Sequence, residues 1–189
     1  MAQNIIPEYN RNRILEWLNE DGIPIRERQL NEQQIRNVVF LLESMQPPFP
    51  TISIYSTILH PDRIIIHGGV NLAPNHVQIF NNDWEPNRRN IFLLDLQNRL
   101  TMLDVRFQLV HRDNQFIGVT INLSIMNDEL TKGRLSYSYV RIQEIINIIR
   151  NIMSVNLGTG IQQQPPNDHT PVLFGNLTSL HQIILFVMF

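Results

Sequence analysis

Three histidines lie close together in the chain, as the ligands of a metal site often do. His60, His67 and His76 follow one another at irregular intervals, and Asp62 stands beside the first. Zinc ligands usually recur at short fixed spacings, because one helical turn or one tight loop must present them to a single ion. These four residues show no such spacing, so the sequence predicts no metal site.

A second candidate for chemistry is the pair Gly68–Gly69, which stands before Asn71 and Pro74. The free N–H groups at a helix N-terminus can bind an anion, but the glycine spacing of phosphate-binding loops is missing here. We interpret the two glycines as a tight turn from a strand into a helix, with a positive φ angle that glycine tolerates.

The residue patterns of nucleophilic catalysis are missing as well. The chain has no cysteine, which excludes disulfides, a thiol nucleophile and thiolate-ligated metals. No serine stands in the Gly-x-Ser-x-Gly pattern that exposes a nucleophile. We therefore expect no enzymatic activity, no catalytic residue and no cofactor. The alternative is a small enzyme whose site is assembled from scattered polar residues near His67, Asn71 and His76.

The charged residues of the chain nearly balance. Fifteen basic and 17 acidic residues give a formal net charge of -2, so little attraction to nucleic acid or to an anionic membrane is expected. Lys132 is the single lysine, and the other basic residues are arginines. Arginine favours planar, bidentate pairing with carboxylates. We therefore expect ion pairs and a protein or peptide partner, and neither nucleic acid nor a membrane.

The elements that would position these residues follow from the spacing of apolar side chains. A helix is predicted from Asn10, whose side chain can cap it, to Gly22, which can end it. The segments 51–58 and 63–67 are predicted strands, because they are rich in β-branched residues and the first alternates apolar with polar side chains. The segment 35–45 has apolar residues at helical spacing as well, but its run Val38-Val39-Phe40 and the prolines that follow it favour a strand.

Two long helices are predicted in the second half of the chain. The first covers 86–102, where apolar residues recur at helical spacing. The second covers 128–153 and begins at Asp128, whose side chain can cap the N-terminus. The buried stripe of the second helix is expected to consist of Leu135, Tyr139, Ile142, Ile145, Ile146, Ile149 and Met153.

A hairpin is predicted between these helices, from strands at 105–109 and 117–123. Both strands alternate cleanly, so we expect the hairpin to lie inside the sheet. Strand runs separated by helices predict an α+β fold, with an antiparallel sheet and helices on one face. The expected core residues of the hairpin are Phe107, Leu109, Val119 and Ile121.

Three stretches of the chain resemble a known family. They are RILEWLNEDGI near the start, IIIHGGVNLAPNH in the middle and IMNDELTKGRLSYSYVRIQEIINII further on. They are similar to a family of uncharacterised archaeal proteins whose fold is like that of the type III secretion chaperones. The resemblance covers about Arg11 to Asn156. The matching positions are Gly69, Val70, Asn71, Pro74, Asp128, Leu130 and Thr131.

This resemblance implies the element order α-β-β-β-α-β-β-α, and the C-terminal segment from Leu157 to Phe189 has no counterpart in it. A resemblance in fold does not itself imply a function, but type III secretion chaperones are typically homodimers without enzymatic activity that bind extended segments of partner proteins. The leading hypothesis is therefore a chaperone-like protein-binding module, which docks a partner segment on a groove or a sheet edge. A structural subunit of a larger complex is a further alternative.

The chain divides into three parts by composition. Residues 1–156 form the chaperone-like α+β domain, 157–168 a linker rich in glutamine and proline, and 169–189 an apolar C-terminal segment. An uncharged apolar run with high β-propensity aggregates when exposed, so we expect it to dock in cis or on a second protomer. The candidate partner-binding residues are Ile183, Ile184, Leu185, Phe186 and Val187.

The N-terminal residues show no signal peptide, since no basic start precedes an apolar run. No stretch reaches the roughly 18 consecutive apolar residues that a spanning helix needs. A cytoplasmic location is expected.

Overall fold

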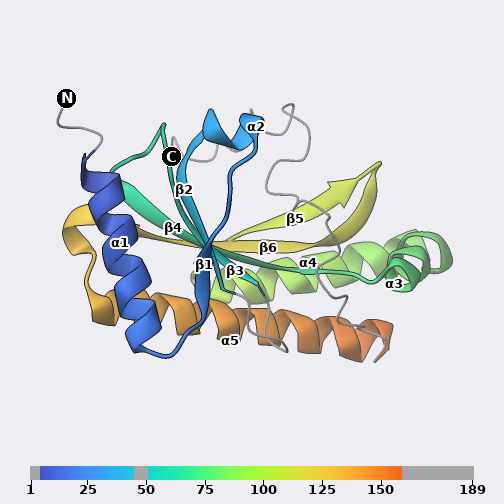
Figure 1. The fold of residues 1–189 in the computed structure, drawn as a ribbon. Coiled ribbons are helices and arrows are strands. Elements are labelled where there is room, and N and C mark those ends of the chain that lie inside the picture. The colour runs from blue at the N-terminus through green and yellow to red at the C-terminus, as the bar shows by residue number, and fades with distance from the viewer. Residues whose placement is uncertain (1–4, 45–50, 159–189) are drawn as a thin grey trace.

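The computed structural model of the chain describes residues 5–44 and 51–158 (Figure 1). The helices are α1 (Ile5–Glu20), α2 (Glu32–Ile35), α3 (Pro74–Gln78), α4 (Pro86–Met102) and α5 (Lys132–Leu157). The strands are β1 (Ile25–Glu27), β2 (Val38–Ser44), β3 (Ile52–Thr57), β4 (Arg63–Asn71), β5 (Arg106–Arg112) and β6 (Gln115–Met126). A π-helix, η2 (Ile79–Asp83), follows α3, and a 3-10 helix, η3 (Asn127–Glu129), precedes α5.

The six strands form one sheet in the order β1-β2-β3-β4-β6-β5, and every neighbouring pair is antiparallel. The predicted α+β class is therefore confirmed. The strand predicted at 35–45 is β2, and the alternating segment at 51–58 is β3. The short edge strand β1 was not predicted, because its three residues are too few to show a period.

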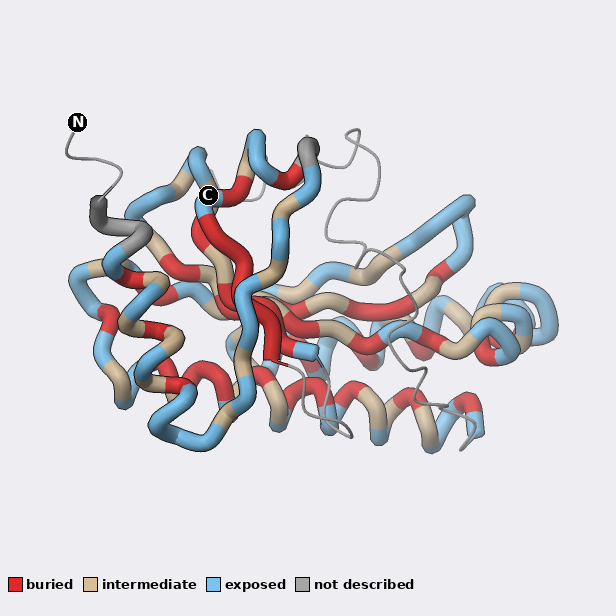
Figure 2. The backbone as a smooth tube through the Cα atoms, viewed as in Figure 1, coloured by how far each residue is buried: buried red, intermediate tan, exposed pale blue. Residues whose placement is uncertain are grey.

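The long helices α1, α4 and α5 lie on the same side of the sheet (Figure 1). Alternate residues of β4 face them, and Ile64, Ile66 and Val70 are buried there. All seven residues of the predicted α5 stripe are buried against this face. Figure 2 shows the same division, with buried residues along the central strands and on one side of α5. We call this side of the sheet the helix face.

Gly68 and Gly69 do not form the predicted turn, because β4 continues through both of them to Asn71. Neither glycine has a positive φ angle. A Cβ atom on Gly68 would lie 2.6 Å from Ile146 Cδ1 and 2.9 Å from Ile142 Cγ2. Glycine is needed at this position because α5 packs directly on the strand backbone and leaves no room for a side chain. The predicted turn had explained the same glycine by a positive φ angle, which the structure does not show.

Two predicted helix caps also differ from the structure. Helix α1 begins at Ile5, so Asn10 is buried within the helix and does not cap it. Thr131 caps α5 by accepting a hydrogen bond from the Arg134 N–H, whereas Asp128 lies in η3. The predicted end of the first helix is correct, since Gly22 has a φ angle of 71° and glycine adopts this conformation without strain.

The predicted hairpin exists, but its two strands differ in position. Strand β6 is inside the sheet, and Val119 and Ile121 are fully buried on the helix face. Strand β5 is the edge strand, so Phe107 and Leu109 pack against the core while remaining partly exposed. The prediction that both strands lie inside the sheet is therefore wrong for β5, because clean alternation shows one buried face and does not show how many neighbours a strand has.

Helix α5 is 26 residues long. Neither it nor any other helix in the described ranges is both long and apolar enough to cross a membrane.

Candidate functional site

The sheet face turned away from α1, α4 and α5 carries an unusual set of polar and aromatic side chains. We call it the open face, because none of the three long helices packs against it (Figure 1). Cross-strand pairing places its residues in rows, since directly opposed residues point to the same side of a sheet. Its central residues are Leu41 and Glu43 of β2, Ser53 and Tyr55 of β3, Ile65 and His67 of β4, and Asn122 of β6.

His67 is the candidate histidine that lies on the open face. Its Nδ1 atom is 2.6 Å from the Oδ1 atom of Asn122, and an amide oxygen accepts, so Nδ1 carries the hydrogen. Burial lowers the pKa of His67, and the hydrogen bond with Asn122 partly opposes this shift. The Tyr55 ring stands edge-on to the imidazole, with 6.4 Å between ring centroids. Burial raises the pKa of Tyr55 to about 12.

The other two residues of the alternative enzymatic site, Asn71 and His76, do not lie beside His67. Asn71 lies on the same face of β4 but four residues further along, about 13 Å away at the usual strand rise, and it is exposed. His76 lies in α3 and is buried, and its Nδ1 atom has no hydrogen-bond partner among the described residues. The three residues proposed for an enzymatic site therefore occupy three separate environments.

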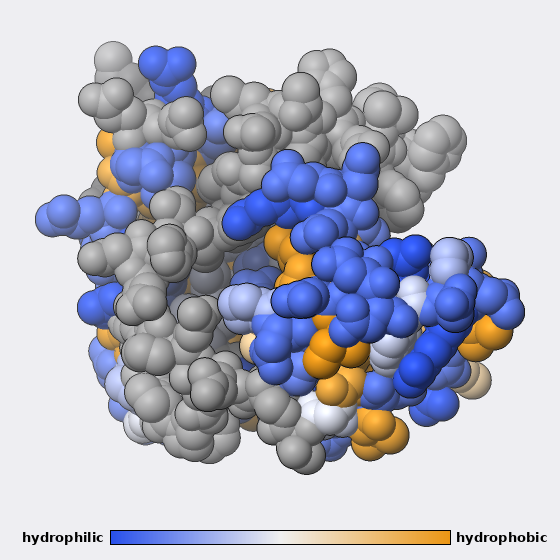
Figure 3. Space-filling view, turned by 90° about the vertical axis from the view of Figure 1, so that its right-hand side faces the viewer, coloured by the Kyte–Doolittle hydropathy of each residue, from blue (hydrophilic) through white to orange (hydrophobic). Residues whose placement is uncertain are grey.

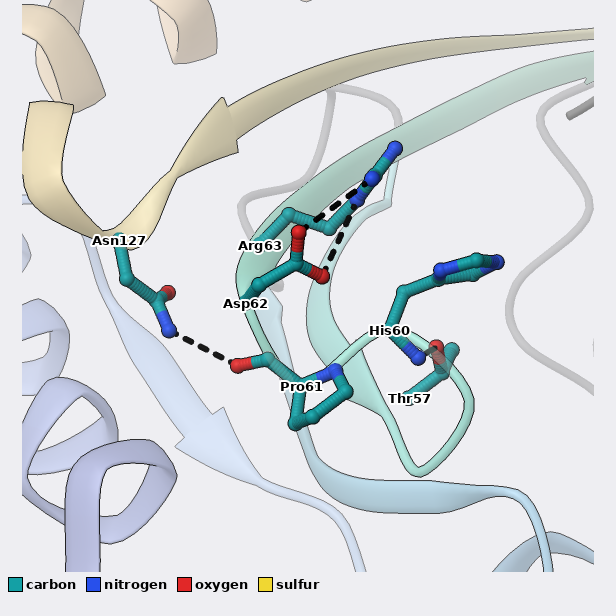
Figure 4. A network of polar contacts seen from close by, with 6 residues as sticks. All are labelled: Thr57, His60, Pro61, Asp62, Arg63 and Asn127. Carbon is teal, nitrogen blue, oxygen red and sulfur yellow. Dashed lines mark hydrogen bonds and ion pairs between the residues drawn. The ribbon is translucent and has the colours of Figure 1, made fainter. Parts of the chain in front are cut away.

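His60 and Asp62 belong to the turn between β3 and β4 (Figure 4). The His60 N–H donates to Thr57 Oγ1 at 3.2 Å, and Asn127 Nδ2 donates to the Pro61 carbonyl at 2.8 Å. The Asp62 carboxylate pairs with the neighbouring Arg63 at 3.4 Å, while the His60 ring points away from it (Figure 4). These contacts hold the turn together.

Metal-ligating residue types do not converge in the part of the chain that the structure describes. Within residues 5–44 and 51–158, no group of three or more histidine, aspartate or glutamate side chains could hold a metal ion.

A shallow groove of about 350 Å³ runs between the C-terminal part of α4 and the second half of α5. Its walls are mostly apolar, and Met102 at its rim is 87% exposed. The groove is lined by Arg99, Met102, Leu103, Ile148, Asn151 and Ile152.

Further exposed apolar side chains lie on α4 and α5, the two helices that line the groove. The outward side of a helix on a globular protein is normally polar, and large contiguous apolar patches are uncommon on monomers. We call this surface the outer helical face. Seen from the α3 end, the surface is largely hydrophilic, with separate hydrophobic groups among the polar side chains (Figure 3). The exposed apolar residues are Ile91, Leu94 and Met102 of α4 and Tyr137, Val140, Ile148 and Val155 of α5.

The sheet edges are less suited to a partner than the groove. Strand β5 forms one edge, with Arg106 and Arg112 exposed at its two ends, and neither forms an ion pair with a described residue. A register shift between Val110 and His111 also interrupts this edge. Charges and bulges at an edge discourage the addition of another strand, and the opposite edge, β1, has just three residues.

The groove residues were not predicted from the sequence, although a signal for them is present. The last helix has isoleucines at 148 and 152 in addition to those of its buried stripe. One helix face cannot bury all of these side chains. The excess of apolar residues therefore marks a second apolar side, which a search for polar chemistry does not detect. The proposed binding residues Ile183, Ile184, Leu185, Phe186 and Val187 lie outside the described residues.

Comparison with known proteins places the chain in a family. The model of a family of uncharacterized conserved proteins, DUF2299, matches residues 10–153. The chain therefore belongs to this family. None of the curated proteins matches it.

Solved structures with a similar fold include an uncharacterized protein from Methanothermobacter thermautotrophicus. That structure has a TM-score of 0.69 and 23% sequence identity, and the match covers 79% of this chain and 99% of that one. It supports the fold described above. YbjN from E. coli has a TM-score of 0.46, 14% identity and coverages of 80% and 93%. The ExsC–ExsE complex has a TM-score of 0.47, 13% identity and coverages of 76% and 92%.

Proposed function

We propose that this DUF2299 protein is a non-enzymatic protein-binding module that docks an apolar segment of a partner in the groove between α4 and α5. The observation that carries the proposal is the groove with its mostly apolar walls, together with the exposed apolar side chains of the outer helical face on the same two helices. Laying an apolar segment into a groove between helices is a common mode of protein recognition. A chaperone-like role, like that of the proteins whose fold the sequence resembles, is part of this proposal.

The surroundings of the groove define the chemistry of the segment. Asp95 pairs with Arg99 at 2.8 Å and Arg141 pairs with Glu144 at 3.3 Å, and all four belong to α4 or α5. Because both signs of charge are already paired there, no net charge is demanded of the partner. Affinity would come from apolar side chains, each worth about 1.5–3 kcal/mol when fully buried, together with Met102, whose flexible side chain adapts to different shapes.

A second copy of the chain is the other candidate for the same surface. Two-fold symmetry would place the outer helical face of one protomer against the same residues of the other, which makes any apolar patch self-complementary. The expected homodimer is proposed on this ground. A cytoplasmic setting, as expected from the sequence, is also part of the proposal.

The two alternatives have less support. An enzyme at His67, Asn71 and His76 would need residues that lie apart in the structure to come together. A structural subunit would use the same groove, but its partner would stay bound permanently.

The groove can be tested with Met102→Asp/Ile148→Asp, which places charges on side chains that are already partly exposed. Peptides selected from a displayed random library against the full-length protein should be apolar, and the double variant should bind them at least tenfold more weakly. The matched control is Ser124→Asp, an exposed position on the open face.

Light scattering on the same proteins distinguishes the occupants. A dimeric wild-type protein and a monomeric double variant would assign the groove to a second copy. Peptide binding that the double variant retains, together with an unchanged oligomeric state, would contradict the proposed site.

A further inference from the structure

The centre of the open face is an apolar and aromatic strip across three strands. Leu41 of β2 is opposite Tyr55 of β3, and Tyr55 is opposite Ile65 of β4. Directly opposed side chains are near enough to touch, so the three form one continuous row. Ser124 of β6, opposite Ile65, ends the row with an exposed polar residue.

Polar residues surround this strip. Glu43 is 5% exposed and pairs with Arg28 at 2.9 Å, and His67 is held by Asn122. Each of these polar groups already has a partner within the domain. A segment that covers the strip therefore does not have to supply a charge. An uncharged apolar segment is the chemistry that fits it.

The environment of the strip is already poor in water. Leu41 is 2% exposed, and burial shifts the pKa values of both Tyr55 and His67 toward their neutral forms. On the helix face such burial comes from α1, α4 and α5, but none of these helices lies on the open face (Figure 1).

The same chain contains a segment of the required chemistry. Helix α5 ends at Leu157, and Gly158, with a φ angle of 92°, ends the described part of the chain. Residues 159–189 follow, and the run from Ile183 to Phe189 is uncharged and apolar. The 28 residues from Gly158 to Leu185 can span roughly 90 Å when extended, far more than the path from one side of a sheet to the other requires.

We propose that the C-terminal run Ile183–Val187 covers the open face of its own chain, against Leu41, Tyr55 and Ile65. The run is β-prone and uncharged, so exposure to water would favour aggregation, and the strip is an apolar row across the centre of the open face. This inference does not depend on the proposed function, because it concerns the opposite side of the sheet from the groove.

Cysteine cross-linking can test this placement in the full-length protein, since the natural chain has no cysteine. The test pair is Ser124→Cys with Leu185→Cys, and the matched control is Asn151→Cys with Leu185→Cys. Ser124 and Asn151 are both exposed, on the open face and at the groove respectively. A short bismaleimide, followed by peptide mapping of the monomer band, measures the yield of intramolecular cross-link.

The proposal expects at least a fivefold higher intramolecular yield for the test pair than for the control. A higher yield for the control would place the run in the groove and overturn the proposal. Equal yields, or no cross-link in either pair, would overturn it too. A cross-link that forms between two chains would show exchange between protomers and contradict docking in cis. Circular dichroism of each variant confirms that the fold is retained.

Discussion

The helix face and the open face of the sheet contain the same six strands but differ in chemistry. Ile64, Ile66 and Val70 of β4 meet α5 through hydrocarbon alone, and Gly68 lets the helix approach the backbone. On the other side of the same strands, Tyr55 and His67 keep polar atoms in a buried setting. The helix face is organised for close packing. On the open face, the pKa values of Tyr55 and His67 depend on how far these side chains are buried.

This difference indicates where function can change without loss of the fold. Cavities and overpacking on the helix face act on the free energy of unfolding directly. On the open face and the outer helical face, a substitution is expected to change the contacts with whatever segment or partner lies on that face. Its effect on the free energy of unfolding is expected to be smaller. The predictions below compare neighbouring residues that belong to different faces.

The largest effect is expected for Val119→Asp on the helix face. Val119 is fully buried in β6, an inner strand between β4 and β5, and a carboxylate there would have no described cation beside it. We expect the free energy of unfolding to fall by about 4 kcal/mol or more, because a buried charge without a partner is among the most costly changes. Urea denaturation followed by circular dichroism measures the loss.

The matched control is Thr120→Asp, one residue further along β6 and on the open face, where the side chain is half-buried. Its expected cost is within about 1 kcal/mol. Equal losses for the two variants would show that the faces do not differ in the way described.

A smaller effect is expected for Gly68→Ala, which tests how closely α5 packs. The added Cβ would be 2.6 Å from Ile146 Cδ1, so the helix or its side chains must move, and overpacking of this kind costs about 1–3 kcal/mol. Gly133→Ala in α5 is the control, since a Cβ there meets nothing within 4 Å. Thermal melting should show a lower midpoint for the first variant and an unchanged or slightly higher one for the second.

These comparisons show which parts of the fold the sequence could predict. The helix at 86–102 and the buried stripe of α5 were correct, because periodicity records the side of an element that is buried. The predicted turn at Gly68–Gly69 was wrong. A glycine that lets a helix pack close to a strand and a glycine that forms a turn cannot be distinguished in a sequence. The position of β5 at the edge was also missed, since strand order depends on long-range pairing.

The candidate site was harder to predict than the fold. His67 was singled out, but its partner Asn122 is 55 residues away in the chain and meets it through the pairing of β4 with β6. The groove depends on Met102 and Ile148, which come from different helices. No spacing rule connects them, and the pattern of either helix alone shows just an excess of apolar residues.

Tyr55 provides a test of burial on the open face at high pH. Its pKa is about 12 in the folded protein against 10.0 for the unperturbed group. Above pH 10 the unfolded chain therefore loses this proton before the folded chain does, so stability should fall as the pH rises from 10 towards 12. Absorbance at 295 nm should show a late ionisation step that Tyr55→Phe removes. A wild-type titration without such a step would contradict the burial of Tyr55.

The smallest effect is expected from His67, and its sign is opposite. Burial lowers the pKa of His67 in the folded protein below its usual value of 6.5, so below that pH the unfolded chain binds the proton more readily. The contribution is fully present above pH 6.5 and is lost as the pH falls towards the lowered folded value. His67→Gln, which can still donate to Asn122, should flatten the decline of unfolding free energy between pH 8 and pH 5. Asn122→Ala should steepen it, because the hydrogen bond with Asn122 raises the pKa of His67. Urea denaturation at a series of pH values measures how the unfolding free energy of each protein changes with pH. The same slope in the wild type, His67→Gln and Asn122→Ala would mean that the open face does not keep His67 away from water.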